Sequence, residues 1–349
     1  MKTTIVVPTI REEFILAFLD AWREPFSQSH IIIVEDNPLR TIDFGKEPNV
    51  THYAWADIDR ELGSDSWIIP RRTDCIRSFG YFKAWQERPD MIVTLDDDCY
   101  PSDGRGGEFL DHHRQRLFTT GRSEAWQTSA KDIATRGVPY YSVAREWPVV
   151  VNHGMWLGVP DYDAPSQLVR SRLAGSFAFE NQTIPTGKYF PMCGMNLAFR
   201  TEVVPALYFL LMGRDYEYDR FGDIWAGIFV KKICDHLGYA IHSGEPAVSH
   251  QRASNVWANL RKEAAALEMN ESLWQAVDQV VLTGTTFGDC YQELADKLPL
   301  EGDYWTRLRR AMAVWRHLFD DQGEVIPESI DDFHSADLSA TGFSPTGPA

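Results

Sequence analysis

The segment Met91–Cys99, MIVTLDDDC, joins an apolar run to three consecutive aspartates. Such a run is typical of a parallel strand covered on both faces of its sheet. Because ligands of open α/β sheets bind beyond the carboxyl ends of the strands, Asp96, Asp97 and Asp98 stand where a ligand is expected. So much negative charge in a small space favours a cation, and Mg²⁺ or Mn²⁺ combines one or two carboxylates with phosphate oxygens. The segment therefore indicates a nucleotide-diphosphate site, with a solvated acidic turn as the alternative.

Predicted strands and helices alternate around this segment. Thr4–Val7 and Ile31–Val34 predict two further short strands, the second followed by Glu35 and Asp36. The helix between them places on one face Phe14, Ile15, Phe18, Leu19 and Trp22. A second helix is expected over Asp74–Gln86, directly before the segment with the aspartates. This alternation, with acidic residues at two strand ends, predicts an α/β fold with a mixed, mostly parallel sheet flanked by helices.

Weaker patterns describe the rest of the chain. The stretch Pro101–Gly187 is rich in Gly, Pro and Arg and has little periodicity, so we expect loops there. Helices are expected over Glu202–Met212, Ile224–Leu237, Val256–Leu267, Leu273–Leu282, Tyr291–Leu298 and Tyr304–Phe319. We therefore expect a catalytic domain over residues 1–250, a helical extension packed on it over 251–320, and an acidic, disordered tail over 321–349.

Composition narrows the class of protein and its partners. The formal net charge is −16, and seven acidic residues but no Lys or Arg follow Arg316. Without a basic stripe, nucleic acid is not expected as a partner. The five cysteines show no CxxC spacing, which argues against a disulfide framework and a zinc cluster. We find no secretory segment and no apolar run that could span a membrane, and expect a soluble cytoplasmic protein. A monomer and a homo-oligomer both stay open.

Two common nucleotide-binding patterns are missing from the sequence. Neither GxGxxG nor GxxxxGK[ST] occurs, so we expect no flavin or NAD and no ordinary nucleotide triphosphatase site.

Nine short motifs follow one another along residues 3–300. They are Pro8-Thr9-Ile10-Arg11, Asp96-Asp97-Asp98-Cys99, Arg136-Gly137-x-Pro139, His153-Gly154-x-Trp156-Leu157, Pro160-Asp161-Tyr162-Asp163-Ala164-Pro165, Pro191-Met192-Cys193-Gly194-Met195-Asn196-Leu197-Ala198-Phe199, Asp223-x-Trp225-Ala226-Gly227, Ile233-Cys234-Asp235-His236-Leu237 and His250-x-x-Ala253-Ser254-Asn255. Together they resemble the reversibly glycosylated polypeptides, the UDP-arabinopyranose mutases of plants and their microbial relatives. We expect a microbial member of this family.

The resemblance implies a GT-A-like, Rossmann-like nucleotide-sugar fold and a divalent metal. It also implies that the pyranose and furanose forms of a nucleoside-diphosphate sugar are interconverted without a redox cofactor. An arginine of the protein would be reversibly glycosylated, and the matching positions are Arg136 and Arg145. At Val34–Asn37 the chain reads VEDN where plant members read closer to VQDGD. This departure leaves open a UDP-L-arabinose type of substrate and a GDP-sugar such as GDP-L-galactose.

Candidate ligands for the metal and the nucleotide sugar follow from these motifs. Asp98 is the expected metal ligand, with Asp96 as a ribose or second metal contact and His250 completing the coordination or serving only the structure. Arg77 would hold the diphosphate, unless it is a surface charge. The other expected nucleotide-sugar contacts are Pro8, Thr9, Arg11, Asp36, Asp97 and a turn over Met192–Asn196 that contains Gly194 and Asn196.

Breaking the anomeric carbon–phosphate bond and reclosing the ring needs groups that hold the sugar and move protons. An arginine nucleophile is almost always protonated, so a carboxylate beside it would have to orient it. Asp161, Asp163 and Asp223 are the candidates, with turn residues and a helix N-cap as their structural alternatives. His153 is a further candidate for contact with the sugar or phosphate, with packing as its alternative.

The same residues allow other functions. A GT-A glycosyltransferase would pass the sugar to an external acceptor, and a nucleotidyltransferase would use the paired carboxylates to release pyrophosphate. A self-glycosylated scaffold without catalysis is the third alternative, and the intact acidic triplet argues against it.

Overall fold

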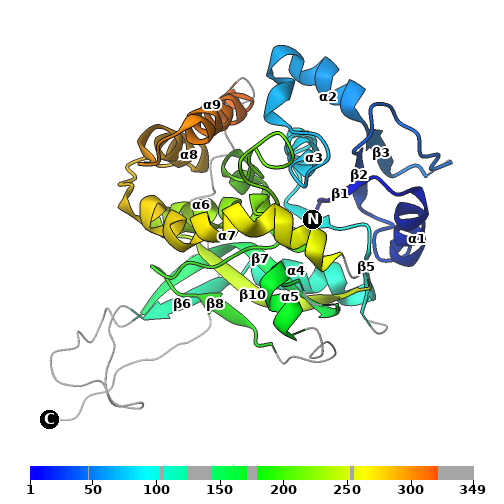
Figure 1. Cartoon of the computed structure of the whole chain (residues 1–349). Helices are drawn as coiled ribbons and strands as arrows, with labels where there is room; N and C mark the ends of the chain where they lie inside the picture. Colours follow the sequence, from blue (N-terminus) through cyan, green and yellow to red (C-terminus); the bar gives the residue numbers. More distant parts are fainter. Residues whose placement is uncertain are drawn as a thin grey trace, which may run out of the picture.

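The computed structural model describes residues 1–45, 47–102, 106–124, 144–159, 161–170, 179–251 and 255–320. A sheet runs through the molecule, and helices α8 (Phe287–Lys297) and α9 (Asp303–His317) lie on the opposite side of it from α1 (Glu12–Trp22), as Figure 1 shows. No helix in these ranges is long and apolar enough to cross a membrane. The predicted tail over 321–349 lies outside the described residues.

Along the sheet the strands follow the order β3-β2-β1-β4-β9-β7-β10-β5. Their bounds are β3 Val50–Tyr53, β2 His30–Glu35, β1 Thr3–Thr9, β4 Met91–Leu95, β9 Asn196–Arg200, β7 Ala144–Gly158, β10 Ala240–His250 and β5 Cys99–Pro101. Among these described strands, four neighbouring pairs are parallel and three are antiparallel. Strands β6 (Thr120–Glu124) and β8 (Gln182–Ile184) pair with β7 and β10. The mixed, mostly parallel sheet flanked by helices that was predicted is confirmed.

Alternation of side chains along the N-terminal strands divides the core into two layers. Val6 and Ile32 point into a cluster with α3 (Ile76–Gln86) and α6 (Gly222–Leu237), whereas their neighbours Ile5 and Ile31 pack with α1. Because both faces are covered, the strands are apolar almost throughout. The carboxyl ends of β1, β2 and β4 are thereby fixed at one edge of the sheet.

Three predictions about individual elements are wrong. The helix expected over Glu202–Met212 is only a 3₁₀-helix, η3 (Thr201–Ala206), because Pro205 removes a backbone donor and the next residues continue as buried irregular chain. The two helices expected over Val256–Leu267 and Leu273–Leu282 form one helix, α7 (Val256–Gln279), with no Gly or Pro to interrupt it.

The third wrong prediction concerns Pro101–Gly187, which contains regular structure instead of loops. Its described part holds the long strand β7, the helices α4 (Phe109–Leu117) and α5 (Ala164–Arg170), and a short 3₁₀-helix, η2 (Gly106–Glu108). The remaining elements, α2 (Trp55–Leu62) and η1 (Gly63–Ile68), precede α3.

The helical extension shares its core with the α/β part. Residues of α7, α8 and α9 belong to the same buried cluster as α3 and α6. Trp225 of α6 stacks on Trp305 of α9 at 5.7 Å between ring centroids, and its indole N–H donates to Asn270 of α7 at 3.1 Å. The extension is therefore packed on the sheet domain, while the domain division at residue 250 stays a prediction.

Candidate active site at the carboxyl ends of the strands

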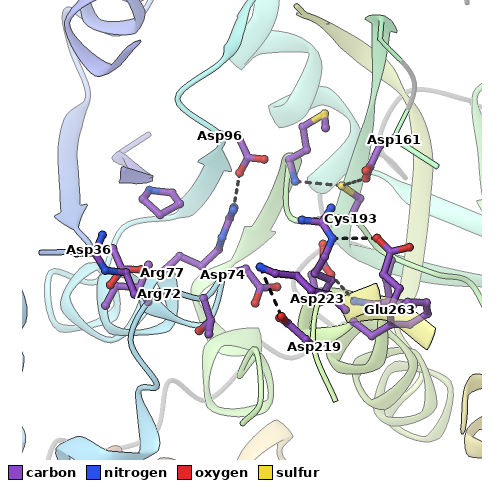
Figure 2. A pocket seen from close by; sticks show the side chains of 18 of the residues that line it. Asp36, Arg72, Asp74, Arg77, Asp96, Asp161, Cys193, Asp219, Asp223 and Glu263 are labelled. Atoms are coloured by element: carbon purple, nitrogen blue, oxygen red, sulfur yellow. Dashed lines mark hydrogen bonds and ion pairs between the residues drawn. The ribbon is translucent and has the colours of Figure 1, made fainter. Parts of the chain in front are cut away.

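An open cleft of about 940 Å³ lies at the carboxyl ends of β1, β2 and β4. Figure 2 shows Asp36 and Arg72 at one end of it, Asp96 in the middle, and Asp161, Asp223 and Glu263 at the other end. We call these the Asp36 end and the Asp223 end. The cleft is long enough to hold a ligand with three chemically different parts.

The turn after β4 carries the acidic triplet, and its middle residue faces inward. Asp97 is 2% exposed and accepts a hydrogen bond from the Thr9 hydroxyl at 2.6 Å. Arg11 donates from Nε to the same carboxylate at 3.2 Å and also pairs with it through Nη2. Because both oxygens of Asp97 are engaged, this residue ties the end of β1 to the triplet.

Asp96 is held by an arginine that crosses beneath it. Arg77 pairs with Asp96 through Nη2 and donates from Nη1 to the Thr94 hydroxyl at 3.1 Å and to the Gly194 carbonyl at 2.5 Å. Arg77 is 5% exposed, so the alternative of a surface charge is wrong. Burial acts to lower its pKa, but the charge of Asp96 outweighs this and raises it, so Arg77 stays a cation.

Asp98 faces a histidine from the other half of the sheet. Oδ1 of Asp98 lies 3.7 Å from Nε2 of His250, and Nδ1–H of His250 donates to the Val159 carbonyl at 2.8 Å. In the neutral imidazole, that bond places the lone pair on Nε2, as in histidines that ligate metals. Burial, and then the charge of Asp96, raise the pKa of Asp98 to about 6. A divalent cation fits this pair of donors.

The three predicted metal ligands do not gather as one group. Across the described residues, no three His, Cys, Asp or Glu side chains lie together as a metal site. Arg77 engages Asp96, and Arg11 engages Oδ2 of Asp98 at 3.2 Å, so Oδ1 of Asp98 and Nε2 of His250 are the candidate protein donors. Further ligands would have to come from a diphosphate or from water.

At the Asp36 end, a carboxylate stands among hydrogen-bond donors. Asp36 accepts from the Trp55 indole at 2.7 Å and from the backbone N–H of Arg72, and burial raises its pKa. The Arg72 guanidinium lies 5.3 Å from the centre of the Trp55 ring. Pro8 lines the same end. This end can bind a flat, polar group such as a nucleobase.

At the Asp223 end, carboxylates lie at the start of α6. Asp223 accepts the backbone N–H of Gly194 at 2.9 Å, and the backbone N–H of Asp223 donates to Asp74. Burial, and then the charge of Asp74, raise the pKa of Asp223 to about 7. The Cys193 thiol donates to Asp161 at 2.7 Å. Groups of this kind can exchange protons with a bound ligand near neutral pH.

Comparison with known proteins assigns the family. The family described as "Reversibly glycosylated polypeptide" matches residues 2–324. The chain belongs to this family. It is 36% identical to "Probable UDP-arabinopyranose mutase 1" of Pisum sativum over 97% of this chain and 95% of that protein. It is 38% identical to "UDP-arabinopyranose mutase 3" of Arabidopsis thaliana over 89% of each chain. These relatives are plant proteins, so the expected microbial origin stays a prediction.

Among solved structures, the chain is similar to that of S. aureus TarS residues 1–349 in complex with UDP-GlcNAc. The two share 12% identity with a TM-score of 0.39, over 91% of this chain and 72% of that chain.

Four described residues that the family motifs suggested are not among those that line the cleft, namely His153, Gly194, Asn196 and His250, and two of them are buried inside the sheet. Asn196 is buried in the sheet, where its carbonyl accepts from His113 Nε2 at 3.1 Å and its amide donates to the Pro246 carbonyl at 2.9 Å. His153 is buried as well, with Nδ1 at 3.2 Å from the Ser243 hydroxyl. For His153 these contacts support the packing alternative, and for Asn196 the expected contact with the sugar stays a prediction.

The remaining predicted residues of this reversibly glycosylated polypeptide lie in the cleft, next to it, or outside the described residues. Asp163 lines the cleft but also caps α5, where it accepts from the backbone N–H of Ser166 at 2.8 Å. Gly194 lets Arg77 pass, because a Cβ there would lie 3.1 Å from Arg77 Nη1 and 2.7 Å from Phe209. Arg136 and the side chain of Arg145 lie outside the described residues.

Sequence reasoning missed several lining residues. Arg72 was overlooked at the Asp36 end, together with Trp55, which bonds to Asp36 but does not itself line the cleft. Asp74, Arg220 and Glu263 were overlooked at the Asp223 end. The consecutive Arg71-Arg72 pair before α3 was the one local signal among them. The others come together only through contacts between distant segments.

Proposed function

We propose that this chain is a nucleoside-diphosphate-sugar mutase that interconverts the pyranose and furanose forms of a UDP-linked sugar of the L-arabinose type. The observation that carries the proposal is a single cleft with three chemically different regions, in a chain whose relatives are named UDP-arabinopyranose mutases. The base would lie at the Asp36 end, the diphosphate at the triplet, and the sugar at the Asp223 end. The relatives' names favour UDP over GDP.

Asp98 and His250 would hold a divalent cation at the diphosphate. When bound, Mn²⁺ or Mg²⁺ would neutralise charge that develops on the leaving diphosphate as the anomeric C–O bond breaks. Asp96 and Asp97 support this arrangement from below, because Arg77 and Arg11 fix their carboxylates. The four side chains would place the scissile bond between the triplet and the start of α6.

Asp223 would move the proton that ring opening and closure require. Opening the pyranose adds a proton to the ring oxygen, and closing the furanose removes a proton from another hydroxyl of the same sugar. One group that donates a proton and then regains one therefore balances the reaction. With a pKa of about 7, Asp223 can do both at neutral pH. The arginine predicted to carry the sugar between these steps is Arg136 or Arg145.

The test is an incubation of the purified protein with Mn²⁺ and UDP-L-arabinopyranose, followed by anion-exchange chromatography. A new peak of unchanged mass, formed without release of UDP and lost in D223N, is the expected result. UDP released without an isomer would overturn the mutase and indicate transfer of the sugar to water or an acceptor. GDP-linked sugars in the same panel test the choice of base.

A further inference from the structure

Helix α7 of the helical extension contributes to the Asp223 end of the cleft through Lys262, Glu263 and Asn270. Glu263 is 3% exposed, and both its carboxylate oxygens are used. Oε2 accepts the backbone N–H of Ala164, at the start of α5, at 2.7 Å. Oε1 accepts Nε–H of Arg220 at 2.9 Å. A buried carboxylate engaged on both oxygens is a fixed anchor and is not available as a ligand group.

Arg220 is the residue that this anchor fixes. It stands just before α6 with a φ of +65°, a conformation that few residues other than glycine adopt. Its side chain lines the cleft and is 38% exposed. Because Nε is bound to Glu263, the plane of the guanidinium is set, and its two Nη groups carry the remaining N–H donors.

The surroundings of Arg220 identify which part of a ligand it would meet. Burial acts to lower its pKa, but the bond with Glu263 and the charges of Glu263, Asp161 and Asp74 raise it, so it stays a cation. Figure 2 shows Asp161 and Glu263 at the end of the cleft opposite Asp36, with Asp96 between them. A nucleotide with its base at the Asp36 end and its diphosphate at the triplet would present its sugar to Arg220.

We propose that Arg220, oriented by Glu263, donates hydrogen bonds to the hydroxyl groups of the nucleotide's sugar, and that α7 thereby helps select it. The identity of the ligand rests on the function proposed above. The guanidinium fork can bridge two neighbouring hydroxyl oxygens, which a lysine ammonium cannot match in geometry. Arg220 would contact the substrate, whereas Glu263 would act as a positioning residue.

The test compares the affinity for UDP with that for UDP-L-arabinopyranose by isothermal titration calorimetry in the presence of Mn²⁺. We expect R220M to bind the nucleotide sugar roughly tenfold to a hundredfold more weakly, as lost charge-assisted hydrogen bonds would give. Its affinity for UDP should stay within about twofold of wild type, because the base and diphosphate contacts are untouched. R220K should lose part of the affinity for the sugar.

Glu263 is tested by the same two titrations. E263Q keeps the size of the side chain but weakens its hydrogen bond with Arg220. It should therefore lower the affinity for the UDP-sugar less than R220M does, and leave the affinity for UDP unchanged. R316M is the matched control, since Arg316 lies 3.6 Å from Asp289 and links α9 to α8 away from the cleft. It should leave both affinities unchanged.

The outcomes separate this inference from the proposed function. Equal losses for UDP and UDP-sugar in R220M, or no loss, would overturn the role of Arg220. A wild type that binds the UDP-sugar no more tightly than UDP would overturn it as well. If the wild type binds the sugar selectively through Arg220 yet forms no isomer, the mutase fails and the sugar contact stands. If the wild type binds neither ligand, both proposals fail.

Discussion

Asp96, Asp97 and Asp98 are chemically identical neighbours, yet each carboxylate has a different set of partners. Asp97 turns inward to Thr9 and Arg11, and Asp96 meets Arg77. Asp98 shares Arg11 through one oxygen at 3.2 Å and faces His250 with the other. A residue's role here depends on the charge that the fold brings against it, which its position in the triplet does not reveal. Substitutions of the three residues should therefore have different consequences.

We expect D97N to lower the free energy of unfolding by about 1.5–3 kcal/mol, because Arg11 and Thr9 lose a buried charged acceptor. Urea denaturation measures this. D98N, the neighbouring control, should keep most of its stability and lose affinity for Mn²⁺ in calorimetry. If both variants lose the same amount of stability and both still bind Mn²⁺, the proposed division of roles is wrong.

Asp223 should make stability depend on pH. Its pKa of about 7 lies above the value of about 3.9 in an unfolded chain, so between these pH values the folded protein keeps a proton that the unfolded chain has lost. The stabilisation is complete below about pH 4 and is lost as the pH rises through 7. Asp74 and Asp161 strengthen the shift, and Arg77 opposes it.

Between pH 5 and 8, the wild type should therefore lose at least about 1 kcal/mol more free energy of unfolding than D223N. Urea denaturation at the two pH values provides the measurement. The matched control is D20N, at an exposed position of α1. A D223N variant with the same pH dependence as the wild type would refute a protonated Asp223 in the fold.

Elements whose burial follows one simple period could be predicted from the sequence. The apolar runs within β1, β2 and β4 were predicted correctly, and so was the apolar face of α1 apart from Phe14, which is only half-buried. Strand β7 was missed because it buries Asn152 and His153, which read as exposed residues. Asn152 forms hydrogen bonds with His113 and His242 inside the sheet. Both partners are distant in the sequence, so the residues around Asn152 could not predict its burial.

The candidate site residues also fall into two groups, those that could be predicted from the sequence and those that could not. Asp36, Asp98 and Asp223 follow or begin regular elements, and their positions in the sequence were enough to find them. Arg220 and Glu263 are separated by 43 residues, and only the folded contact between them reveals their importance. The long separation explains why spacing alone could not predict the wall of the cleft formed by α7.

The packing of α3 on the sheet depends on a glycine. A Cβ on Gly80 would lie 2.5 Å from Val6 Cγ1 and 3.0 Å from Val34 Cγ2. We expect G80A to lower the free energy of unfolding by about 1–3 kcal/mol through overpacking. Thermal denaturation checks this against G107A, because a Cβ on Gly107 would meet nothing within 4 Å. Equal melting temperatures for the two variants would contradict the close approach of α3.

At the scale of the molecule, the sugar side of the cleft is strongly negative. The acidic residues that line it are Asp74, Asp161, Asp163, Asp219, Asp223 and Glu263, and the basic ones are Arg220 and Lys262. Arg220 pairs with Glu263 at 2.9 Å, Lys262 lies 3.7 Å from Asp219, and Asp223 keeps part of its proton at neutral pH. The carboxylates of Asp74, Asp161 and Asp163 still leave this side of the cleft negative. Neutral sugars suit such a surface better than uronic acids.

We therefore expect the protein to bind UDP-glucuronic acid at least about tenfold more weakly than UDP-glucose. Calorimetry with the two ligands, which differ in one carboxylate, measures the ratio. Added salt should narrow the difference, because it screens charges near the surface. Equal affinities at low salt would show that the carboxylates do not face the sugar.

Glu263 of α7 joins the start of α5 to Arg220, two residues ahead of α6. This connection has a consequence for biosynthesis. The acidic triplet and the strands of the sheet are translated before α7. Until α7 is made, the nascent chain therefore has no Glu263 to fix Arg220. Because α7, α8 and α9 also complete the core shared with α3 and α6, a half-made polypeptide should lack a finished cleft as well as a fixed Arg220. Substrate selection arrives only when α7 has left the exit tunnel and docked.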